Sequence, residues 1–298
     1  MATQTKLKLN IIGKKSNPNF GAVIIHNTKD KLADATILGR TFVDWVSFAC
    51  GELPHKVIKT EEKINVIDFL KGKVDKTYDY LIVLYSSAPL MTEDTIKEIV
   101  EYASIKGISL CKLPVGYVIK VADYISGMIQ IDSVYSRNIE DFYVVENKKQ
   151  LNHAIEVLQE RINNFHMNNG VEIKKPKSVY IEPMVDIEDG VIIYPNNSLK
   201  GETYISSSVI LKENNVIENS KIGANSCISG SVINKSIIGD NVYISSFCEI
   251  DNSLIGRDTL IDKGSLIKNY NIRPNEKIKA NSILGETNDS NSGAGQSR

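Results

Sequence analysis

The sequence lacks an excess of charge of either sign. Its 298 residues include 35 lysines and arginines against 36 aspartates and glutamates, a formal net charge of −1. Chains that bind nucleic acid or an anionic membrane through long-range attraction carry a basic surplus. The sequence also contains no run approaching the ~18 uninterrupted apolar residues of a membrane span. We therefore expect neither a nucleic-acid nor a membrane partner.

Paired cysteines and a secretion signal are lacking as well. The cysteines Cys50, Cys111, Cys227 and Cys248 are scattered and form no C-x-x-C motif, so they offer neither a zinc knuckle nor a disulfide framework. We interpret them as small buried residues in a reducing compartment. The first apolar segment is too short for a signal peptide, and we expect a cytoplasmic protein.

The second half of the chain carries a repeat. Aliphatic residues recur at steps of five or six over residues 181–283, as at Ile222, Ile228 and Ile233. Neither an amphipathic helix nor an alternating strand has this period. Three such steps make one triangular coil, with Gly, Asn, Asp and Ser at its corners. The spacing predicts a parallel β-helix of hexapeptide repeats over 171–285.

Upstream, apolar strands alternate with amphipathic helices, which is typical of an α/β domain. The apolar run at 79–85 predicts a strand buried on both faces of a mostly parallel sheet. Thr92 is expected to cap a helix that Gly107 ends. Further strands are expected near 21–26 and 56–60, and a helix near 41–50.

A helix is predicted between the two halves. Its apolar positions predict a helix of about 17 residues that ends at Asn168, Asn169 and Gly170; they are Leu151, Ile155, Leu158, Ile162 and Phe165. The expected organisation is an α/β domain at 1–148, a connecting helix at 149–170, the β-helix at 171–285 and a disordered polar tail at 286–298.

The junction of the two halves resembles that of a known family. The segments Val145-Glu-Asn-Lys-Lys-Gln-Leu151, His166-Met-Asn-Asn-Gly-Val171, Tyr180-Ile181 and Ile193-Tyr-Pro-Asn196 follow the order and spacing of the N-acetylglucosamine-1-phosphate uridylyltransferase (GlmU) family. Tyr85-Ser-Ser-Ala-Pro-Leu90 is similar to that family's Tyr-Gly-Asp-Val-Pro-Leu segment. The resemblance implies a Rossmann-like nucleotidyltransferase domain followed by a left-handed β-helix.

The sequence departs from this family at the nucleotide site. The family's glycine-rich loop holds the nucleotide phosphates through backbone N–H groups, but here the segment after Ile25 is shorter and has no glycine before Gly39. The family's Mg²⁺-binding aspartate corresponds to Ser87, whose neutral hydroxyl is a poor ligand for this cation. The asparagine that assists this aspartate in the family corresponds to Glu146 or Asn147 of this chain.

The resemblance therefore supplies candidate residues and no identified catalytic residue. The candidates for nucleotide or phosphate binding are Lys29, Lys31, Arg40 and Ser87, and the candidate Mg²⁺ ligands are Glu146 and Asn147. Lys29, Lys31 and Arg40 can equally be charged residues on a solvent-exposed face. A phosphate contact is also conceivable for His26, although a partly exposed loop histidine is the simpler interpretation.

Acyl transfer is the function that the sequence supports least. Many proteins with such a β-helix use a histidine as general base, but all four histidines of this chain precede residue 178; they are His26, His55, His153 and His166. The long coils that carry the acetyltransferase site in two-function relatives have no counterpart in the sequence.

The leading hypothesis is a GlmU-like, catalytically impaired protein of sugar-nucleotide or cell-envelope polysaccharide metabolism. It would bind a sugar nucleotide, a sugar phosphate or an active paralogue as a regulatory or structural subunit, and trimerise through its β-helix. An active sugar-1-phosphate nucleotidyltransferase with a rebuilt Mg²⁺ site is the alternative, and a hexapeptide acyltransferase is the third. Whether the protein is an enzyme stays open at this point.

Overall fold

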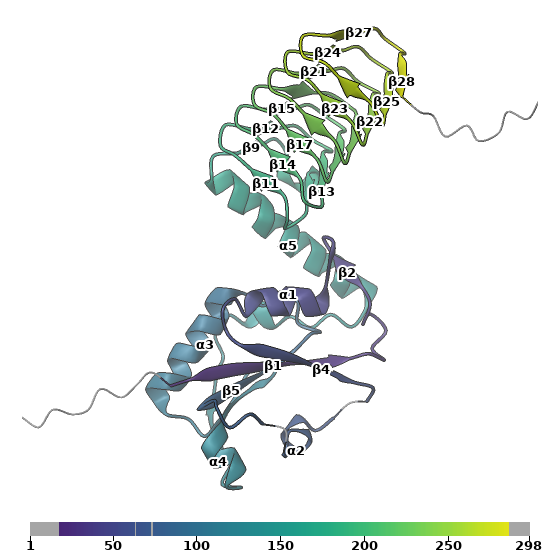
Figure 1. The fold of residues 1–298 in the computed structure, drawn as a ribbon. Coiled ribbons are helices and arrows are strands. Elements are labelled where there is room, and N and C mark those ends of the chain that lie inside the picture. Colours follow the sequence, from purple (N-terminus) through teal and green to yellow (C-terminus); the bar gives the residue numbers. More distant parts are fainter. Residues whose placement is uncertain (1–17, 63, 73, 286–298) are drawn as a thin grey trace, which may run out of the picture. The chain divides into compact units, whose positions relative to one another are not determined.

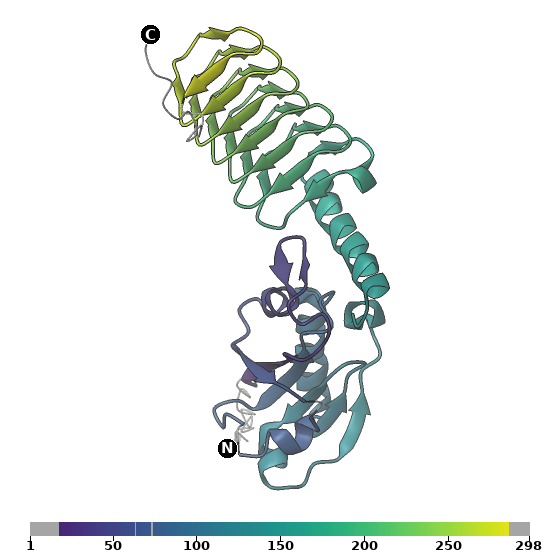
Figure 2. The ribbon, with the colours of Figure 1, turned by 90° about the vertical axis from the view of Figure 1, so that its right-hand side faces the viewer.

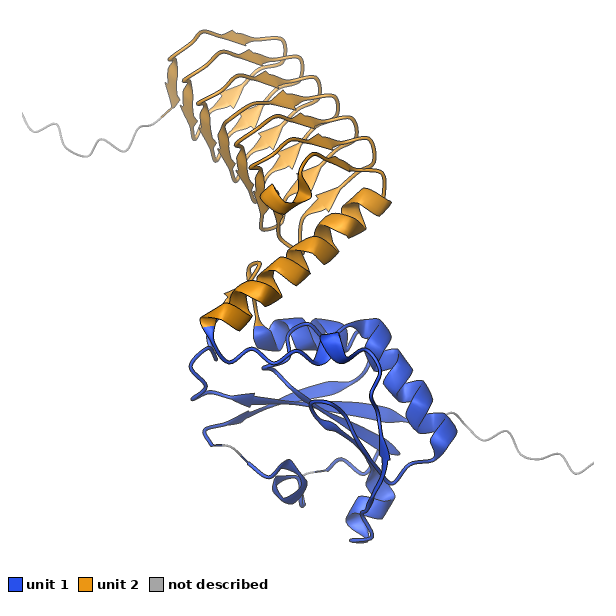
Figure 3. Ribbon diagram, turned by 180° about the vertical axis from the view of Figure 1, so that it is seen from behind, with its two compact units in different colours: residues 1–35, 42–147 blue, residues 36–41, 148–298 orange. Residues whose placement is uncertain are grey.

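The computed structural model describes residues 18–62, 64–72 and 74–285. The chain divides into two compact units, one made of residues 1–35 and 42–147 and the other of residues 36–41 and 148–298 (Figure 3). The predicted disordered tail at 286–298 lies outside the described residues. Within those residues, no helix combines the length and apolar character needed to span a membrane.

The first unit is built on a six-stranded mixed sheet, with strand order β4-β1-β5-β7-β6-β8. Figure 1 labels three of these strands, β1, β4 and β5. Three neighbouring strands run parallel, namely β1 (Phe20–Asn27), β4 (His55–Thr60) and β5 (Tyr80–Tyr85). The rest of the sheet reverses direction at β7 (Tyr117–Lys120) before β6 (Leu110–Lys112) and β8 (Ile131–Val134).

Helices and core residues cover both faces of this sheet. One core contains α1 (Phe42–Ala49) and α3 (Glu93–Lys106), and the other contains residues of α2 (Val66–Phe69) and α4 (Val121–Ile125). Burial from both sides explains why β1 and β5 are apolar at successive positions. The strands and helices predicted for this half are confirmed, as is the α/β fold class.

The two ends of α3 lie at the residues that the sequence predicts. The Thr92 hydroxyl accepts a hydrogen bond from the Thr95 backbone N–H at 3.2 Å, and Gly107 ends the helix in the left-handed conformation at φ 60°. The first turn packs beside η1 (Ile139–Phe142), where the buried Asp141 carboxylate accepts hydrogen bonds from the Thr92 and Thr95 hydroxyls, each at 2.6 Å. These bonds make Asp141 part of the helix cap.

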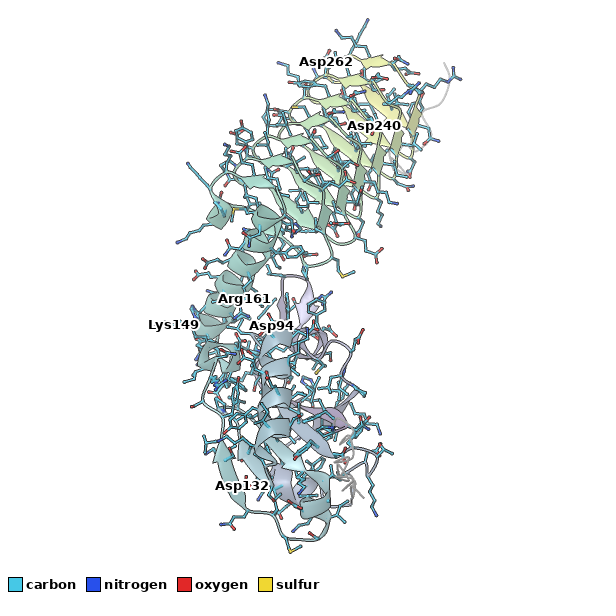
Figure 4. The ribbon with its side chains drawn as sticks, turned by 90° about the vertical axis from the view of Figure 1, so that its left-hand side faces the viewer. Asp94, Asp132, Lys149, Arg161, Asp240 and Asp262 are labelled. Carbon is cyan, nitrogen blue, oxygen red and sulfur yellow. The ribbon has the colours of Figure 1, made fainter. Side chains whose placement is uncertain are left out.

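Side chains also tie strand β8 to the chain before β6. The carboxylate of Asp132 in β8 accepts a hydrogen bond from the backbone N–H of Ser109 at 2.7 Å (Figure 4). Asp132 thereby satisfies a backbone donor at the start of a short strand.

The second unit is a left-handed β-helix of three parallel sheets (Figures 1 and 2). The first sheet contains β10 (Tyr180–Ile181), β13 (Ser198–Lys200), β16 (Val216–Glu218), β19 (Val232–Asn234), β22 (Glu249–Asp251), β25 (Leu266–Lys268) and β28 (Ile283–Gly285). The second contains β11 (Asp186–Ile187), β14 (Tyr204–Ile205), β17 (Lys221–Ile222), β20 (Ile237–Ile238), β23 (Leu254–Ile255) and β26 (Asn271–Ile272). The third contains β9 (Glu172–Ile173), β12 (Ile192–Ile193), β15 (Ile210–Leu211), β18 (Cys227–Ile228), β21 (Tyr243–Ile244), β24 (Leu260–Ile261) and β27 (Lys277–Ile278).

The predicted repeat is confirmed coil by coil. Ile217, Ile233 and Ile250 pair in register on successive coils and are fully buried, so the column of aliphatic residues forms the core of the prism. Polar side chains join the corners of neighbouring coils, as where the Asp240 carboxylate accepts a hydrogen bond from the Ala224 N–H at 2.8 Å (Figure 4).

The long helix α5 (Lys148–Asn168) has 21 residues and groups with the second unit. It packs against β9, β10 and η2 (Pro176–Ser178), and the hairpin of β2 (Thr36–Ile37) and β3 (Arg40–Thr41) also packs against it. The predicted apolar face is partly wrong, because Phe165 is 63% exposed while Asn163 and His166 are buried. Asn163 donates hydrogen bonds to the carbonyl oxygens of Pro176 at 2.8 Å and Val179 at 3.2 Å.

Candidate functional site

The first unit contains a cavity where its three parallel strands end. The last residues of β1, β4 and β5 line it together with Ser86, Ser87 and the loop after β1, and its volume is about 380 Å³. Ligands of open α/β sheets bind beyond the carboxyl ends of the strands, and the volume lies within the usual range for a small-molecule site. This cavity, called the strand-end pocket below, is the candidate functional site.

His26 lies on strand β1 and not in the loop after it. The strand continues to Asn27 because His26 and Asn27 pair in register with Lys59 and Thr60 of β4. The side chain of His26 is 8% exposed, and its Nδ1 lies 3.0 Å from the Ser86 hydroxyl oxygen. The interpretation of His26 as a partly exposed loop residue is therefore wrong, and the residue belongs to the pocket wall.

The loop after β1 bonds mainly to itself. The Asn27 carboxamide accepts a hydrogen bond from the Lys29 N–H at 3.0 Å and donates one to the Asp30 carboxylate at 2.9 Å. The N–H groups of Asp30, Ala33 and Ala35 donate to carbonyl oxygens within the same segment. An anion-binding nest needs consecutive N–H groups that face outward, and these donors are already engaged.

The structure brings three of the candidate residues together. Lys31, Ser87 and Glu146 line the pocket, and the Val145 N–H donates to the Ser87 carbonyl oxygen at 2.8 Å, which joins the two segments.

The other three candidates are placed elsewhere. Lys29 forms an exposed ion pair with Glu61 at 3.2 Å. Arg40 lies in the β2–β3 hairpin of the second unit, where its guanidinium donates to the Met184 sulfur at 2.9 Å. Asn147 follows Glu146 but is not among the residues that line the pocket.

A preformed metal centre is not present in the described residues. Nowhere in 18–62, 64–72 and 74–285 do three or more His, Cys, Asp or Glu side chains gather closely enough to hold an ion. Glu146 retains a carboxylate beside Ser87, but a single carboxylate and a neutral hydroxyl make a poor site for Mg²⁺. The residues that are present do not fit the metal that the resemblance implies.

The polar lining is acidic and rich in hydroxyl groups. The lining includes three acidic residues, Asp30, Glu62 and Glu146, and one lysine, Lys31. Burial raises the pKa of Tyr85 above its usual value, so this phenol is neutral at pH 7 and can donate a hydrogen bond.

Sequence reasoning missed Thr60, Ser86 and Glu62 as pocket residues. Thr60 is 8% exposed, and its hydroxyl oxygen is buried without a hydrogen-bond partner among the described residues. Thr60 and Glu62 stand at the end of a predicted strand, and the ends of parallel strands meet at one edge of a sheet. That signal could have found them once β4 was placed beside β1.

The cysteines carry no chemistry in this site. Cys50, Cys111 and Cys248 are buried as predicted, whereas Cys227 is half-buried on the outer side of its strand. Burial raises the pKa of the Cys50 thiol to about 11, which keeps it protonated and unreactive at pH 7.

An α/β domain with a pocket at its strand ends, followed by a left-handed β-helix, is the arrangement that the resemblance to the GlmU family implies. Comparison with known proteins agrees with it. Residues 176–287 match the family described as the GMPPB C-terminal domain. This match adds a second family to which the β-helix part of the chain is similar, beside the GlmU family that the junction motifs predict.

Three relatives described as bifunctional protein GlmU confirm the resemblance. The chain is 27% identical to that of Clostridium acetobutylicum over 286 residues, covering 74% of this chain and 62% of the relative. It is 36% identical to that of Clostridium beijerinckii over 148 residues (49% and 32%) and 34% identical to that of Staphylococcus haemolyticus over 143 residues (48% and 32%). The matches thus span between 32% and 62% of these relatives' length.

Two solved structures are more distant. PerB from Caulobacter crescentus in complex with CoA and GDP-perosamine is 11% identical, with 89% of this chain and 94% of that chain covered and a TM-score of 0.27. The CcmM N-terminal domain in complex with CcmN is 19% identical, with 40% and 83% covered and a TM-score of 0.19. TM-scores this low carry no information on function.

Proposed function

We propose that this chain is a GlmU-like sugar-nucleotide-binding protein without appreciable nucleotidyltransferase activity. Its strand-end pocket binds a sugar nucleotide or sugar phosphate, and the protein acts as a regulatory or structural subunit in sugar-nucleotide or cell-envelope polysaccharide metabolism. A paralogue with intact motifs is the partner that such a subunit would regulate. The proposal includes a cytoplasmic location and a homotrimer.

One observation carries this proposal. The pocket is present at the strand ends, but the groups that would neutralise phosphate charge are not gathered in it. The N–H groups of Lys29, Asp30, Ala33 and Ala35 bond within the loop, Ser87 stands where the family has aspartate, and the pocket lining includes three acidic residues but one lysine. Phosphoryl and nucleotidyl transfer depend almost wholly on positioning and charge neutralisation. A pocket that has lost both can still bind a ligand, but it supplies little transition-state stabilisation.

The test combines turnover and binding on the same preparation. Pyrophosphate release is measured with each nucleoside triphosphate and with N-acetylglucosamine, glucosamine, glucose and mannose 1-phosphates, with Mg²⁺. Ligand binding is measured as a rise in melting temperature, because a ligand that binds only the folded state stabilises it. We expect stabilisation by at least one sugar nucleotide or sugar phosphate without turnover. Turnover above background would refute the impaired-enzyme proposal.

The alternative is an active nucleotidyltransferase with a rebuilt site. The position of Glu146 in the pocket lining beside Ser87 favours it. If this alternative holds, Glu146→Ala abolishes Mg²⁺-dependent pyrophosphate release. The matched control is Glu61→Ala, which removes an exposed carboxylate near the same loop that lies outside the pocket lining. An acyltransferase has no comparable support, since residues 178–285 contain no histidine.

A further inference from the structure

Strand β8 is an unprotected edge of the sheet in the first unit. It ends the strand order, and no strand among the described residues pairs with its outer side. The backbone groups on the outer side of an edge strand can pair with another strand, and proteins usually protect such edges with charged side chains. The opposite edge, β4, exposes Lys56 and Lys59. β8 has no lysine, and its one carboxylate, Asp132, accepts a hydrogen bond from the Ser109 N–H towards the inside of the sheet.

One face of β8 carries two apolar side chains that are largely exposed. Ile131 and Val134 are 53% and 61% exposed. They pair in register with Leu110 and Lys112 of β6, and paired residues of neighbouring strands point to the same side of a sheet. Leu110 belongs to the core that contains α4, so Ile131 and Val134 lie on the α4 side. A strand added beside β8 would cover both if its own apolar residues faced that side.

The other face of the same edge is polar. Helix α3 lies over it, because the Tyr102 hydroxyl oxygen is 2.6 Å from the Ser133 hydroxyl oxygen. The Tyr135 hydroxyl, directly after β8, donates to the Glu98 carboxylate at 3.2 Å, and Glu101 is exposed beside Tyr102 in the helix. The edge of β8 therefore suits a strand that is apolar on the α4 side and polar on the α3 side.

The chain itself contains a segment with this pattern. Residues 1–17 precede the described part of the chain. Between residues 6 and 11 their sequence is Lys-Leu-Lys-Leu-Asn-Ile, in which polar and apolar residues alternate. Alternation with a period of two is typical of a strand with one buried face. In an extended chain Leu7 and Leu9 point to one side and Lys6 and Lys8 to the other, which matches the two faces of the β8 edge.

The segment is long enough to reach β8. The strand directions place the starts of β1 and β8 at the same edge of the sheet. The Asn19 N–H donates to the Asp79 carboxylate at 2.7 Å, which fixes where the chain enters β1. Four strand spacings separate β1 from β8, or ~19 Å. Residues 12–19 span up to ~26 Å when extended. A segment that ends at Ile11 and runs antiparallel to β8 therefore reaches it along one edge of the sheet.

We propose that residues 6–11 pair with the outer side of β8, with Leu7 and Leu9 on the α4 side against Ile131 and Val134. The segment belongs to the same chain, and a short linker gives it an effective concentration of the order of millimolar. This concentration favours it over a second copy of the protein. The inference goes beyond the proposed function and does not depend on what the strand-end pocket binds.

The experiment is hydrogen exchange on the full chain, followed by mass spectrometry. In antiparallel pairing alternate amides of residues 6–11 bond to β8, and they exchange only when the segment detaches. We expect these amides to exchange ~10-fold or more slowly than in a synthetic peptide of residues 1–17. Exchange as fast as in the peptide would overturn the proposal. Protection that rises with protein concentration would also overturn it, because pairing would then occur between copies.

Two full-length variants test the two sides of the contact. Val134→Lys, and the double variant Leu7→Lys, Leu9→Lys, each place charge where the proposal has apolar side chains together. Each should return exchange of residues 6–11 to within ~2-fold of the free peptide. Val57→Lys is the matched control, because it makes the same substitution at a 39% exposed valine of the other edge strand, β4. Equal loss of protection in this control would refute the assignment to β8.

Exchange within β8 gives a second, independent measurement. In the double variant the outward amides of β8 should exchange ~10-fold faster than in the wild type, while those of β4 stay unchanged. Added wild-type peptide of residues 1–17 should slow them again, since it can occupy the vacated edge. Outward amides of β8 that exchange equally in the wild type and the double variant would overturn the proposal. The melting temperature shows that each variant is folded.

Discussion

At the scale of single residues, a buried histidine at the end of α5 couples the protein's stability to pH. His166 is 5% exposed, and burial lowers the pKa of its imidazole below 6.5, with the nearby Asp186 carboxylate opposing the shift only in part. The backbone carbonyl of the same residue accepts hydrogen bonds from the N–H groups of Asn169 and Val171 at 3.1 Å each. These bonds fix the backbone of His166 in the turn that starts the β-helix.

The expected result is a loss of stability as the solution becomes acidic. At a pH well above 6.5 the imidazole is neutral in both the folded and the unfolded state. As the pH falls through and below that value, the unfolded chain binds a proton that the folded chain resists, and this favours unfolding. The melting temperature of the second unit should fall between about pH 7.5 and about pH 5.5, and it should fall less in His166→Gln. His153→Gln, which changes an exposed histidine of the same helix, is the control and should keep the wild-type pH dependence.

Single residues also show where prediction from the sequence ended. Thr92 and Gly107 were predictable because a helix cap depends on a few neighbouring residues. Ser87 and Glu146 were predictable as candidates from the order of motifs along the chain, and Lys31 from its positive charge in the loop after β1. Thr60 was not predicted as a pocket residue, because its place in the lining depends on β4 lying beside β1 in the sheet. No local sequence pattern contains this long-range pairing.

At the scale of elements, the β-helix has a polar ladder beside its aliphatic core. The buried Asn215 donates hydrogen bonds to the Asn197 carboxamide at 2.9 Å and to the Lys212 and Ile228 carbonyl oxygens at 2.6 and 3.3 Å. It also accepts one from the Ser231 N–H at 3.0 Å. Each bond joins one coil to itself or to the next, so this carboxamide connects successive coils.

Removal of this side chain should destabilise the β-helix more than its small size suggests. Asn215→Ala removes the partner of the buried Ser231 N–H and of the Asn197 carboxamide oxygen, and we expect a loss of about 2–3 kcal/mol in the free energy of unfolding. Asn271→Ala, at an exposed outward position of β26, should change it by less than about 0.5 kcal/mol. Far-UV circular dichroism in urea measures both variants, and the emission of Trp45, the only tryptophan, reports separately on the first unit. Equal effects of the two substitutions would contradict the expectation.

The repeat of the β-helix was easier to predict from the sequence than the buried face of helix α5. The step of five or six residues predicted every coil because the same constraint repeats on each strand. The buried face of α5 was predicted less well, because the prediction assumed that the apolar stripe of a helix is its buried face. The end of α5 packs on a turn whose Pro176 and Val179 carbonyl oxygens need donors. That need buries Asn163 and leaves Phe165 exposed.

At the scale of the whole molecule, one sheet of the β-helix carries an apolar ladder on its outer side. The outward positions of five successive strands pair in register and are all apolar; they are Ile192, Ile210, Cys227, Tyr243 and Leu260. Charged residues close the ladder at both ends, at Glu172 and Lys277. A contiguous apolar surface of this kind is typical of an interface between protein chains.

We expect this ladder to be the contact between copies of the chain in the homotrimer proposed above. Tyr243→Lys and Leu260→Lys each place a charge in the middle of the ladder, where desolvation of an unpaired ammonium opposes association. Sedimentation velocity over a range of concentrations should show a trimer for the wild type and mostly monomer for either variant. Ile237→Lys is the matched control, because it places the same charge at a 51% exposed outward position on a different sheet. A wild-type protein that stays monomeric, or a trimer that survives both ladder substitutions but not the control, would show that the chains associate in another way or not at all.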